Sequence, residues 1–343
     1  MPLNERKRQI LRAITNDYID TAEPVGSRTI ARRYGLGVSP ATIRNEMADL
    51  EEDGYLQQPH TSAGRIPSDK GYRFYVDALM DPEELSVEEI RKIREALRAE
   101  HRQMEELVHG SARLLALLSQ YTSIVVAPDL RFGAIRRLQL IPLDEWHVLL
   151  VLVVDPGFVQ SRIVETLRPL QLHEIARMNH FFSQRLSGLM VADIGSSLVG
   201  EMRAEVNDEV LMTEALNLLA RGLRDIKKEN VFLDGTIHLF NQPEFRDINK
   251  VKVLLNVLDD EKMLWDLLSD AFISGIQVTI GRENQHEGFQ DCSLVTASYE
   301  IDGQVVGKVG VIGPTRMDYE RVVTIVECIA MNLSELLSDA RRH

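Results

Sequence analysis

Residues 27–67 constrain the fold more than any other stretch, because helix, turn and strand signals follow one another there without a break. Residues 27–34 predict a short amphipathic helix, residues 35–38 a tight glycine turn, and residues 39–50 a second helix. Residues 55–67 then predict a strand–loop–strand hairpin. Helix, turn, helix and hairpin in this order are typical of a winged helix–turn–helix, which we therefore expect here.

The second of these helices carries its own start and stop signals. Ser39 can cap the free amides of the first turn, and Pro40 stands where a missing N–H has no cost. Gly54 can take the left-handed conformation that follows a last helical turn. A preceding amphipathic helix is predicted over residues 3–21, and Pro24 excludes its continuation.

The two faces of the second helix differ in chemistry. Helical spacing places Ile43, Met47 and Leu50 on the core side. Arg44 and Asn45 lie on the opposite face with small residues, and these types suit a major groove, where Arg pairs with guanine and Asn with adenine. An ordinary polar surface helix is the less favoured explanation of this face taken alone. The flanking helix and hairpin favour DNA reading.

The hairpin adds hydroxyls and cations of the kind that contact phosphates. His60 as a metal ligand is disfavoured, since no second His or Cys stands nearby at ligand spacing. The candidate DNA-contacting residues are Ser27, Arg28, Ser39, Ala41, Thr42, Arg44, Asn45, His60, Thr61, Ser62, Arg65 and Lys70.

Charge is distributed unevenly along the chain. The whole chain has 39 basic and 52 acidic residues and a net charge of −13, whereas residues 1–80 carry equal numbers of each. An acidic body behind a locally basic edge should weaken non-specific DNA binding. We therefore expect tight binding only at a specific site.

Residues beyond 81 predict an α+β arrangement. Residues 82–120 predict one linker helix, whose apolar spacing fits either a coiled-coil seam or, preferably, a helix laid on a neighbouring domain. Strands are predicted within 123–164, at 231–240 and within 276–312, and helices at 170–188, 207–228, 244–257, 260–270 and 316–337. Mixed elements of this kind indicate an antiparallel sheet with helices.

Several classes are excluded or disfavoured. The longest apolar run near the middle, residues 148–154, is too short to cross a membrane, and the N-terminus lacks an apolar signal region. With two cysteines in no metal or disulfide pattern, we expect a cytoplasmic protein. No phosphate loop, zinc helix or nucleophile elbow occurs, so we expect no enzyme activity, no cofactor and no metal. The turn at 313–316 could hold an anion, although a capped strand-to-helix turn is the simpler explanation.

Four separated blocks resemble the bacterial heat-inducible transcription repressors of the HrcA family. They are residues 38–56, residues 59–77, residues 242–245 and residues 310–319. The blocks appear in family order along nearly the whole chain. Ser68 departs from the Thr expected there, but either hydroxyl can cap the following helix.

The resemblance implies a domain plan and a function. It implies a winged-helix domain at 1–81, a linker helix at 82–120, a GAF-like α+β body at 121–167 and 231–343, and an inserted dimerising domain at 168–230. It also implies a homodimer that binds the CIRCE inverted repeat in double-stranded DNA and represses chaperone operons, with the chaperonin as a partner that keeps it active and heat as the signal that ends repression. A repressor whose body binds a metabolite is the alternative, and an enzyme with a DNA-binding appendage ranks last.

Overall fold

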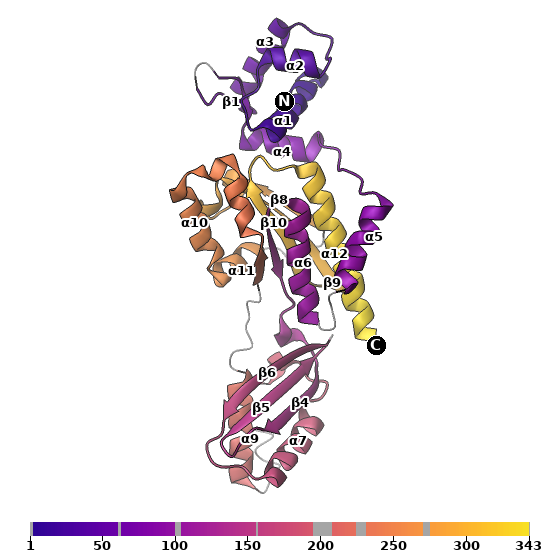
Figure 1. The fold of residues 1–343 in the computed structure, drawn as a ribbon, viewed down its shortest axis with the longest axis vertical. Helices are drawn as coiled ribbons and strands as arrows, with labels where there is room; N and C mark the ends of the chain where they lie inside the picture. The colour runs from indigo at the N-terminus through magenta and orange to yellow at the C-terminus, as the bar shows by residue number, and fades with distance from the viewer. Residues whose placement is uncertain are drawn as a thin grey trace.

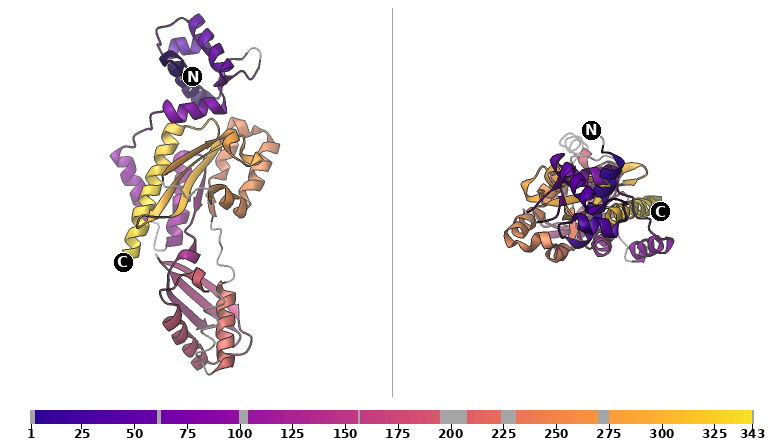
Figure 2. Two further views of the ribbon diagram at one scale, coloured as in Figure 1. Left: turned by 180° about the vertical axis from the view of Figure 1, so that it is seen from behind. Right: turned by 90° about the horizontal axis from the view of Figure 1, so that it is seen from above.

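The computed structural model describes residues 3–60, 63–99, 104–155, 157–194, 208–223, 231–269 and 275–342. It is a mixed α/β chain in which three units follow one another along the long axis (Figure 1). An N-terminal helical unit stands at one end, a sheet covered by helices lies in the centre, and a smaller sheet with two helices forms the other end. Figure 2 shows the same arrangement from behind and from above. We call these the N-terminal unit, the body and the middle unit, the last because it lies in the middle of the sequence.

The N-terminal unit packs four helices and a short two-stranded sheet around one core. Ile10, Ile14, Ile30, Ile43 and Leu50 are fully buried in it. Its elements are α1 (Glu5–Thr21), α2 (Ser27–Arg33), α3 (Pro40–Glu52), β1 (Leu56–Gln57), β2 (Ile66–Pro67) and α4 (Asp69–Ala78). Helix α4 lies between the rest of this unit and the body (Figure 1).

The body is built on a five-stranded antiparallel sheet in the order β7-β3-β10-β9-β8. Its strands are β3 (Thr122–Val126), β7 (Val231–Asp234), β8 (Ile276–Ile280), β9 (Cys292–Ile301) and β10 (Gln304–Pro314). Val295 and Val311 are buried on one face with α6 (Met104–Ser119) and α12 (Tyr319–Arg342). Leu294 and Ile312 are buried on the other face with α10 (Ile248–Leu258) and α11 (Glu261–Ser269).

The segment expected as one linker helix contains two helices instead. These are α5 (Val87–Ala99) and α6, which pack on each other and on α12. Ile93, Leu97, Leu107 and Val108 are all buried in the same core. A straight helix over residues 83–120 would extend about 57 Å, so the chain must change direction to bring both apolar stripes into one core. The sequence allowed either a coiled-coil seam or a helix laid on a neighbouring domain. In the structure both helices pack on the body, as in the second alternative.

The middle unit has its own sheet, separate from that of the body. Strands β4 (Ile135–Pro142), β5 (His147–Val154) and β6 (Phe158–Glu165) form an antiparallel meander, and α7 (Leu172–Leu186) and α9 (Glu209–Leu223) pack on it. The expected division had placed these strands in the body and had begun the inserted unit at residue 168. These strands pair with one another and not with the body sheet, because alternation in a strand predicts which side chains are buried but not which sheet the strand joins.

The strand expected over residues 231–240 is also shorter than predicted. Strand β7 ends at Asp234, and residues Thr236–Asn241 form a 3-10 helix. Gly235 between them has a φ of 71°, and a Cβ there would lie 2.6 Å from the Cβ of Ala116. The left-handed glycine therefore ends the strand at a point where α6 approaches the backbone closely.

Candidate nucleic-acid interface

Helix α3 begins and ends where the local signals predict. Ser39 is its N-cap, and the Ser39 hydroxyl accepts a hydrogen bond of 3.1 Å from the Thr42 amide. Pro40 occupies the first turn. Gly54 has a φ of 79° directly after the helix, as the left-handed C-terminal position requires.

The two faces of α3 separate as expected. Ile43, Met47 and Leu50 are buried, whereas Arg44 and Asn45 are exposed. Ala41, Ala48 and Ser39 are also exposed, and Thr42 is half-buried. Within the described ranges, the Arg44 and Asn45 side chains have no hydrogen-bond or ion-pair partner. Both are therefore available to a partner molecule.

Helix α2 presents a second basic position beside α3. Ser27 is half-buried at its first residue, and Arg28 is exposed. Arg32 stands four residues after Arg28 and is exposed as well, so both lie on the same side of the helix. Neither side chain forms a hydrogen bond or ion pair with another residue in the part of the chain that the structure describes. Arg32 was absent from the sequence-predicted set, although its spacing from Arg28 could have identified it.

The hairpin is anchored to the start of α2 rather than projecting freely from its base. Val25 and Arg65 form an antiparallel bridge whose two backbone hydrogen bonds are each 2.9 Å. A Cβ at Gly64 would lie 2.4 Å from the Val25 oxygen, so only glycine permits this approach. His60 is exposed near the tip. Thr61 and Ser62 lie outside the described residues.

Two of the residues predicted to contact DNA have partners within the N-terminal unit. The Arg65 guanidinium donates to Glu51 at 2.8 Å, and its side chain is only 20% exposed. The Lys70 ammonium donates to the backbone carbonyl oxygen of Asp53 at 2.8 Å and lies 4.3 Å from the centre of the Tyr55 ring. Both cations thus lie at the acidic end of α3, away from Ser39 and Arg44. The sequence shows that a cation is present, but it does not show which acceptor the folded chain brings to it.

Acidic residues on α3 are themselves neutralised by α1. Lys7 lies 3.1 Å from Asp49 and 3.7 Å from Asp53, and Arg6 lies 3.4 Å from Glu46. The hydrogen bond to Asp49 raises the pKa of Lys7, because it stabilises the charged ammonium. The negative end of α3 is therefore partly screened from any polyanion at its other end.

Neither a metal-binding cluster nor a membrane-spanning helix occurs in the part of the chain that the structure describes. No group of three or more His, Cys, Asp or Glu residues there could hold a metal ion. No helix there is both long and apolar enough to span a bilayer.

Known proteins resemble this chain over its whole length. A family model described as the HrcA protein C-terminal domain matches residues 105–323. The heat-inducible transcription repressor HrcA of Natranaerobius thermophilus is 46% identical over 344 residues, covering 98% of each chain. The repressor of the same name from Moorella thermoacetica is 40% identical over 344 residues and covers 100% of each chain. A crystal structure described as a hypothetical protein covers 98% of each chain with a TM-score of 0.66 and 26% identity.

These relatives show the class of protein to which the chain belongs: it is a regulator of transcription and not an enzyme. Within that class it belongs to the HrcA family of heat-inducible transcription repressors.

Proposed function

We propose that the chain is a homodimeric repressor that binds the CIRCE inverted repeat in front of chaperone operons. In this proposal the N-terminal unit is a winged helix–turn–helix, α3 enters the major groove, and the β1–β2 hairpin is the wing. The observation that carries it is the exposed and unpartnered pair Arg44 and Asn45, on a helix whose opposite face is fully buried.

The chemistry of that face supports base reading. An Arg side chain can donate two hydrogen bonds to guanine, and an Asn side chain can pair twice with adenine. Ala41 and Ala48 beside them are small enough to allow close approach of the helix backbone. Arg28 and Arg32 on α2 are placed to contact phosphates, which positions a protein without selecting a sequence.

The open face of the middle-unit sheet supports a dimer. Ile141, Leu149 and Ile163 lie side by side across the three strands on the face opposite to α7 and α9. Ile141 is 39% and Ile163 is 62% exposed, and Val159 on the same face is 46% exposed. An apolar sheet face of this kind fits a second copy of itself about a two-fold axis. A two-fold dimer presents two α3 helices to an inverted repeat.

The domain plan follows from these assignments. We assign residues 1–81 to the winged helix–turn–helix, residues 82–120 to two linker helices, and residues 134–223 to the inserted dimerising unit. The remaining α+β body, with helices on both faces of an antiparallel sheet, is GAF-like. We place the protein in the cytoplasm, where its operator lies.

The roles of heat and of the chaperonin in this proposal are inferred from membership of the family. The chaperonin keeps the repressor active, and unfolded clients that occupy the chaperonin during heat stress leave the repressor unsupported. A marginally stable fold would make this response sensitive, because a change of about 1–2 kcal/mol alters the folded population several-fold.

The proposal is tested by comparing Arg44→Ala and Asn45→Ala with Arg65→Ala in gel shifts. Each α3 variant should lose operator preference over scrambled DNA by about 1–3 kcal/mol, the worth of one bidentate base contact. Arg65→Ala is the matched control, since this arginine is paired with Glu51. Parental operator preference in both α3 variants would refute the proposal. Adding chaperonin before and after warming tests the heat response in the same assay.

A second candidate, a repressor controlled by a metabolite, is favoured by one feature of the body. A cavity of about 770 Å³ opens between α11 and strands β8, β9 and β10, with the buried Lys308 and Thr296 in its wall. This volume lies in the range of small-molecule sites. A thermal-shift screen of the full chain distinguishes the two candidates, because a ligand stabilises the fold that binds it.

A further inference from the structure

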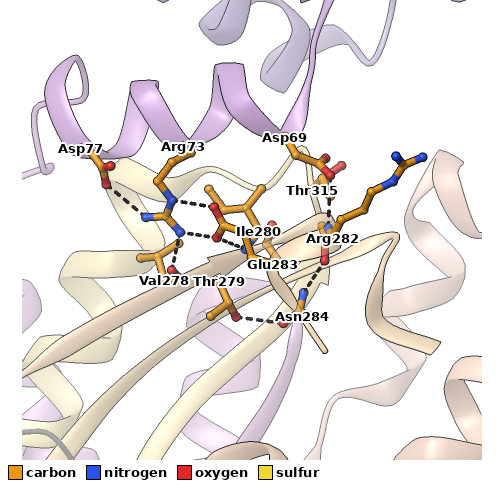
Figure 3. A network of polar contacts seen from close by, with 12 residues as sticks. Asp69, Arg73, Asp77, Val278, Thr279, Ile280, Arg282, Glu283, Asn284 and Thr315 are labelled. Carbon is orange, nitrogen blue, oxygen red and sulfur yellow. Dashed lines mark hydrogen bonds and ion pairs between the residues drawn. The ribbon is translucent and has the colours of Figure 1, made fainter. Parts of the chain in front are cut away.

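Helix α4 joins the N-terminal unit to the body through Arg73, whose guanidinium is hydrogen-bonded to several partners. The Arg73 guanidinium donates to Glu283 Oε1 at 2.8 Å and to the Val278 backbone oxygen at 2.5 Å. A third bond of 3.0 Å goes to Asp77 on α4 itself. Figure 3 shows this side chain reaching from α4 to the end of β8 and the turn Gly281–Glu283.

The partner carboxylate is fixed as firmly as the arginine. Glu283 also accepts a hydrogen bond of 2.8 Å from the Ile280 amide. Burial alone would raise the pKa of Glu283, but the bonds from Arg73 and Ile280 lower it below its ordinary value. The carboxylate is therefore charged at neutral pH, and its two oxygens bind Arg73 in a fork.

The same turn meets α4 a second time. The Asp69 carboxylate accepts a hydrogen bond of 3.1 Å from the Arg282 amide (Figure 3). Gly281 has a φ of 52°, and a Cβ there would lie 2.5 Å from the Asp69 carboxylate. The turn thus approaches the first turn of α4 as closely as a glycine allows.

Two further contacts hold the N-terminal unit at other points of the body. Arg316, which precedes α12, donates to the Ile19 oxygen of α1 at 2.5 Å and to Glu244 at 2.7 Å. Glu320 in the first turn of α12 accepts from the Tyr75 hydroxyl at 2.8 Å. These contacts attach the N-terminal unit to the body at separate places, and such attachment fixes its orientation as well as its position.

We propose that the Arg73–Glu283 pair is a positioning clamp that sets the angle of each DNA-reading unit, and thereby the half-site spacing that the dimer recognises. The inference rests on the proposed function. The pair lies away from the proposed reading face, because α4 is on the body side of the unit, whereas Arg44 and Asn45 are exposed on the face of α3 opposite its buried side. In a dimer joined at the middle units, the two α3 helices are far from the joint, so a small loosening at α4 changes their separation strongly.

The test compares Glu283→Gln with Glu174→Gln in the full chain. Glu174 is a matched control, because it too binds one arginine, Arg168, with both oxygens and one backbone amide, that of Gln171. It lies within the middle unit and joins no two units. Affinity is measured on three duplexes: the full inverted repeat, the same repeat with altered half-site spacing, and a single half-site.

Glu283→Gln should lose roughly tenfold in affinity for the full repeat, a part of the 10²–10⁴ gain that linkage of two sites provides. Its single-half-site affinity should stay within twofold of the parent, and its preference for one spacing should weaken. The affinity of Arg73→Lys for the full repeat should lie between that of the parent and that of Glu283→Gln, since an ammonium cannot form the forked pair of hydrogen bonds. Glu174→Gln should bind all three duplexes as the parent does. Parental discrimination of spacing in Glu283→Gln, or an equal loss on the single half-site, would overturn the clamp.

A measurement without DNA separates this inference from the proposed function. Spin labels at Glu52→Cys and Met331→Cys, in a Cys328→Ser background, report the distance between the N-terminal unit and α12, since both sites are exposed and Cys292 is buried. The parent and Glu174→Gln should give one narrow distance, and Glu283→Gln a broad distribution. A distribution as narrow as that of the parent refutes the clamp, even if the protein binds no operator.

Discussion

The two large sheets of this chain are built from similar strands but are covered differently. In the body, Val295 and Val311 on one face and Ile312 on the other have no exposed surface, or almost none, because helices lie over both faces. In the middle unit, α7 and α9 cover one face only. Ile163 on the open face is 62% exposed.

Apolar strands therefore have two different roles in this chain: they form a buried core in the body and an exposed apolar face in the middle unit. The buried valine and isoleucine side chains on the two faces of the body sheet lie under helices, so they leave no apolar surface for another molecule. The open face of the middle unit leaves Ile141, Leu149, Val159 and Ile163 without cover from the described chain. Exposed apolar surface of this kind indicates association. The two sheets should therefore respond differently to the same substitution.

The largest effect is expected from a charge placed in the body sheet. Val311→Asp would bury a carboxylate between β10 and its covering helices with no partner, at a cost of more than about 4 kcal/mol. The body should fail to fold cooperatively, as denaturant unfolding followed by circular dichroism would report. A parental unfolding midpoint would show that this face is open to water.

The same change on the open face should leave the fold intact and break the proposed dimer. Ile163→Asp places two carboxylates at a two-fold contact, and a tenfold or greater rise in the dimer dissociation constant is expected, roughly 1.4 kcal/mol or more. Sedimentation equilibrium measures this constant. Leu172→Asp is the control, because Leu172 is 73% exposed but stands on α7. Equal effects of the two variants would place the contact elsewhere.

A smaller effect is expected at the free edge of the middle-unit sheet. The Asn179 side chain of α7 accepts from the Leu140 amide at 2.7 Å and donates to the Leu140 oxygen at 2.9 Å. Asn179→Ala leaves both backbone groups without these bonds and should lower the free energy of unfolding by about 1 kcal/mol, because water can replace the lost bonds at the edge of the sheet. The exposed neighbour His180→Ala should change it by less than about 0.5 kcal/mol. Similar losses in both variants would mean that Leu140 does not depend on Asn179.

The smallest effect concerns the acid stability of the middle unit. Hydrogen bonds from Arg168 lower the pKa of Glu174 from 4.5 to about 2. Because the folded pKa is depressed, Glu174 contributes stability that is present above pH 4.5 and is lost as the pH falls towards 2. A carboxyl carbon titration by NMR should give a midpoint near 2. A midpoint near the ordinary value would show that the Arg168 bonds are not formed in solution.

Local features were predictable, and the reason lies in short-range chemistry. The cap at Ser39, the left-handed Gly54 and the separation of Ile43 from Arg44 depend on residues within one or two turns of each other. The locations of most helices and strands followed from periodicity for the same reason. The family was recognisable because its blocks of residues stand in order along the chain, and the full-length relatives confirm it.

Arg65 and Lys70 illustrate where local reasoning ended. Both were expected at the DNA, yet Glu51 and the Asp53 oxygen bind them in the folded unit. The linker expected as one helix became α5 and α6 because both apolar stripes enter one core. The strands within residues 135–165, which were expected in the body, pair with each other and not with β3.

The order of residues by itself determined most of the elements, the buried and exposed faces of α3, and the repressor family, since these depend on spacing and on residue type. Only the tertiary structure decided which sheet each strand joins, which cations are already paired, and how Arg73 and Glu283, 210 residues apart, hold the N-terminal unit on the body. Contacts between distant segments depend on the geometry of the whole fold, which spacing along the chain does not encode.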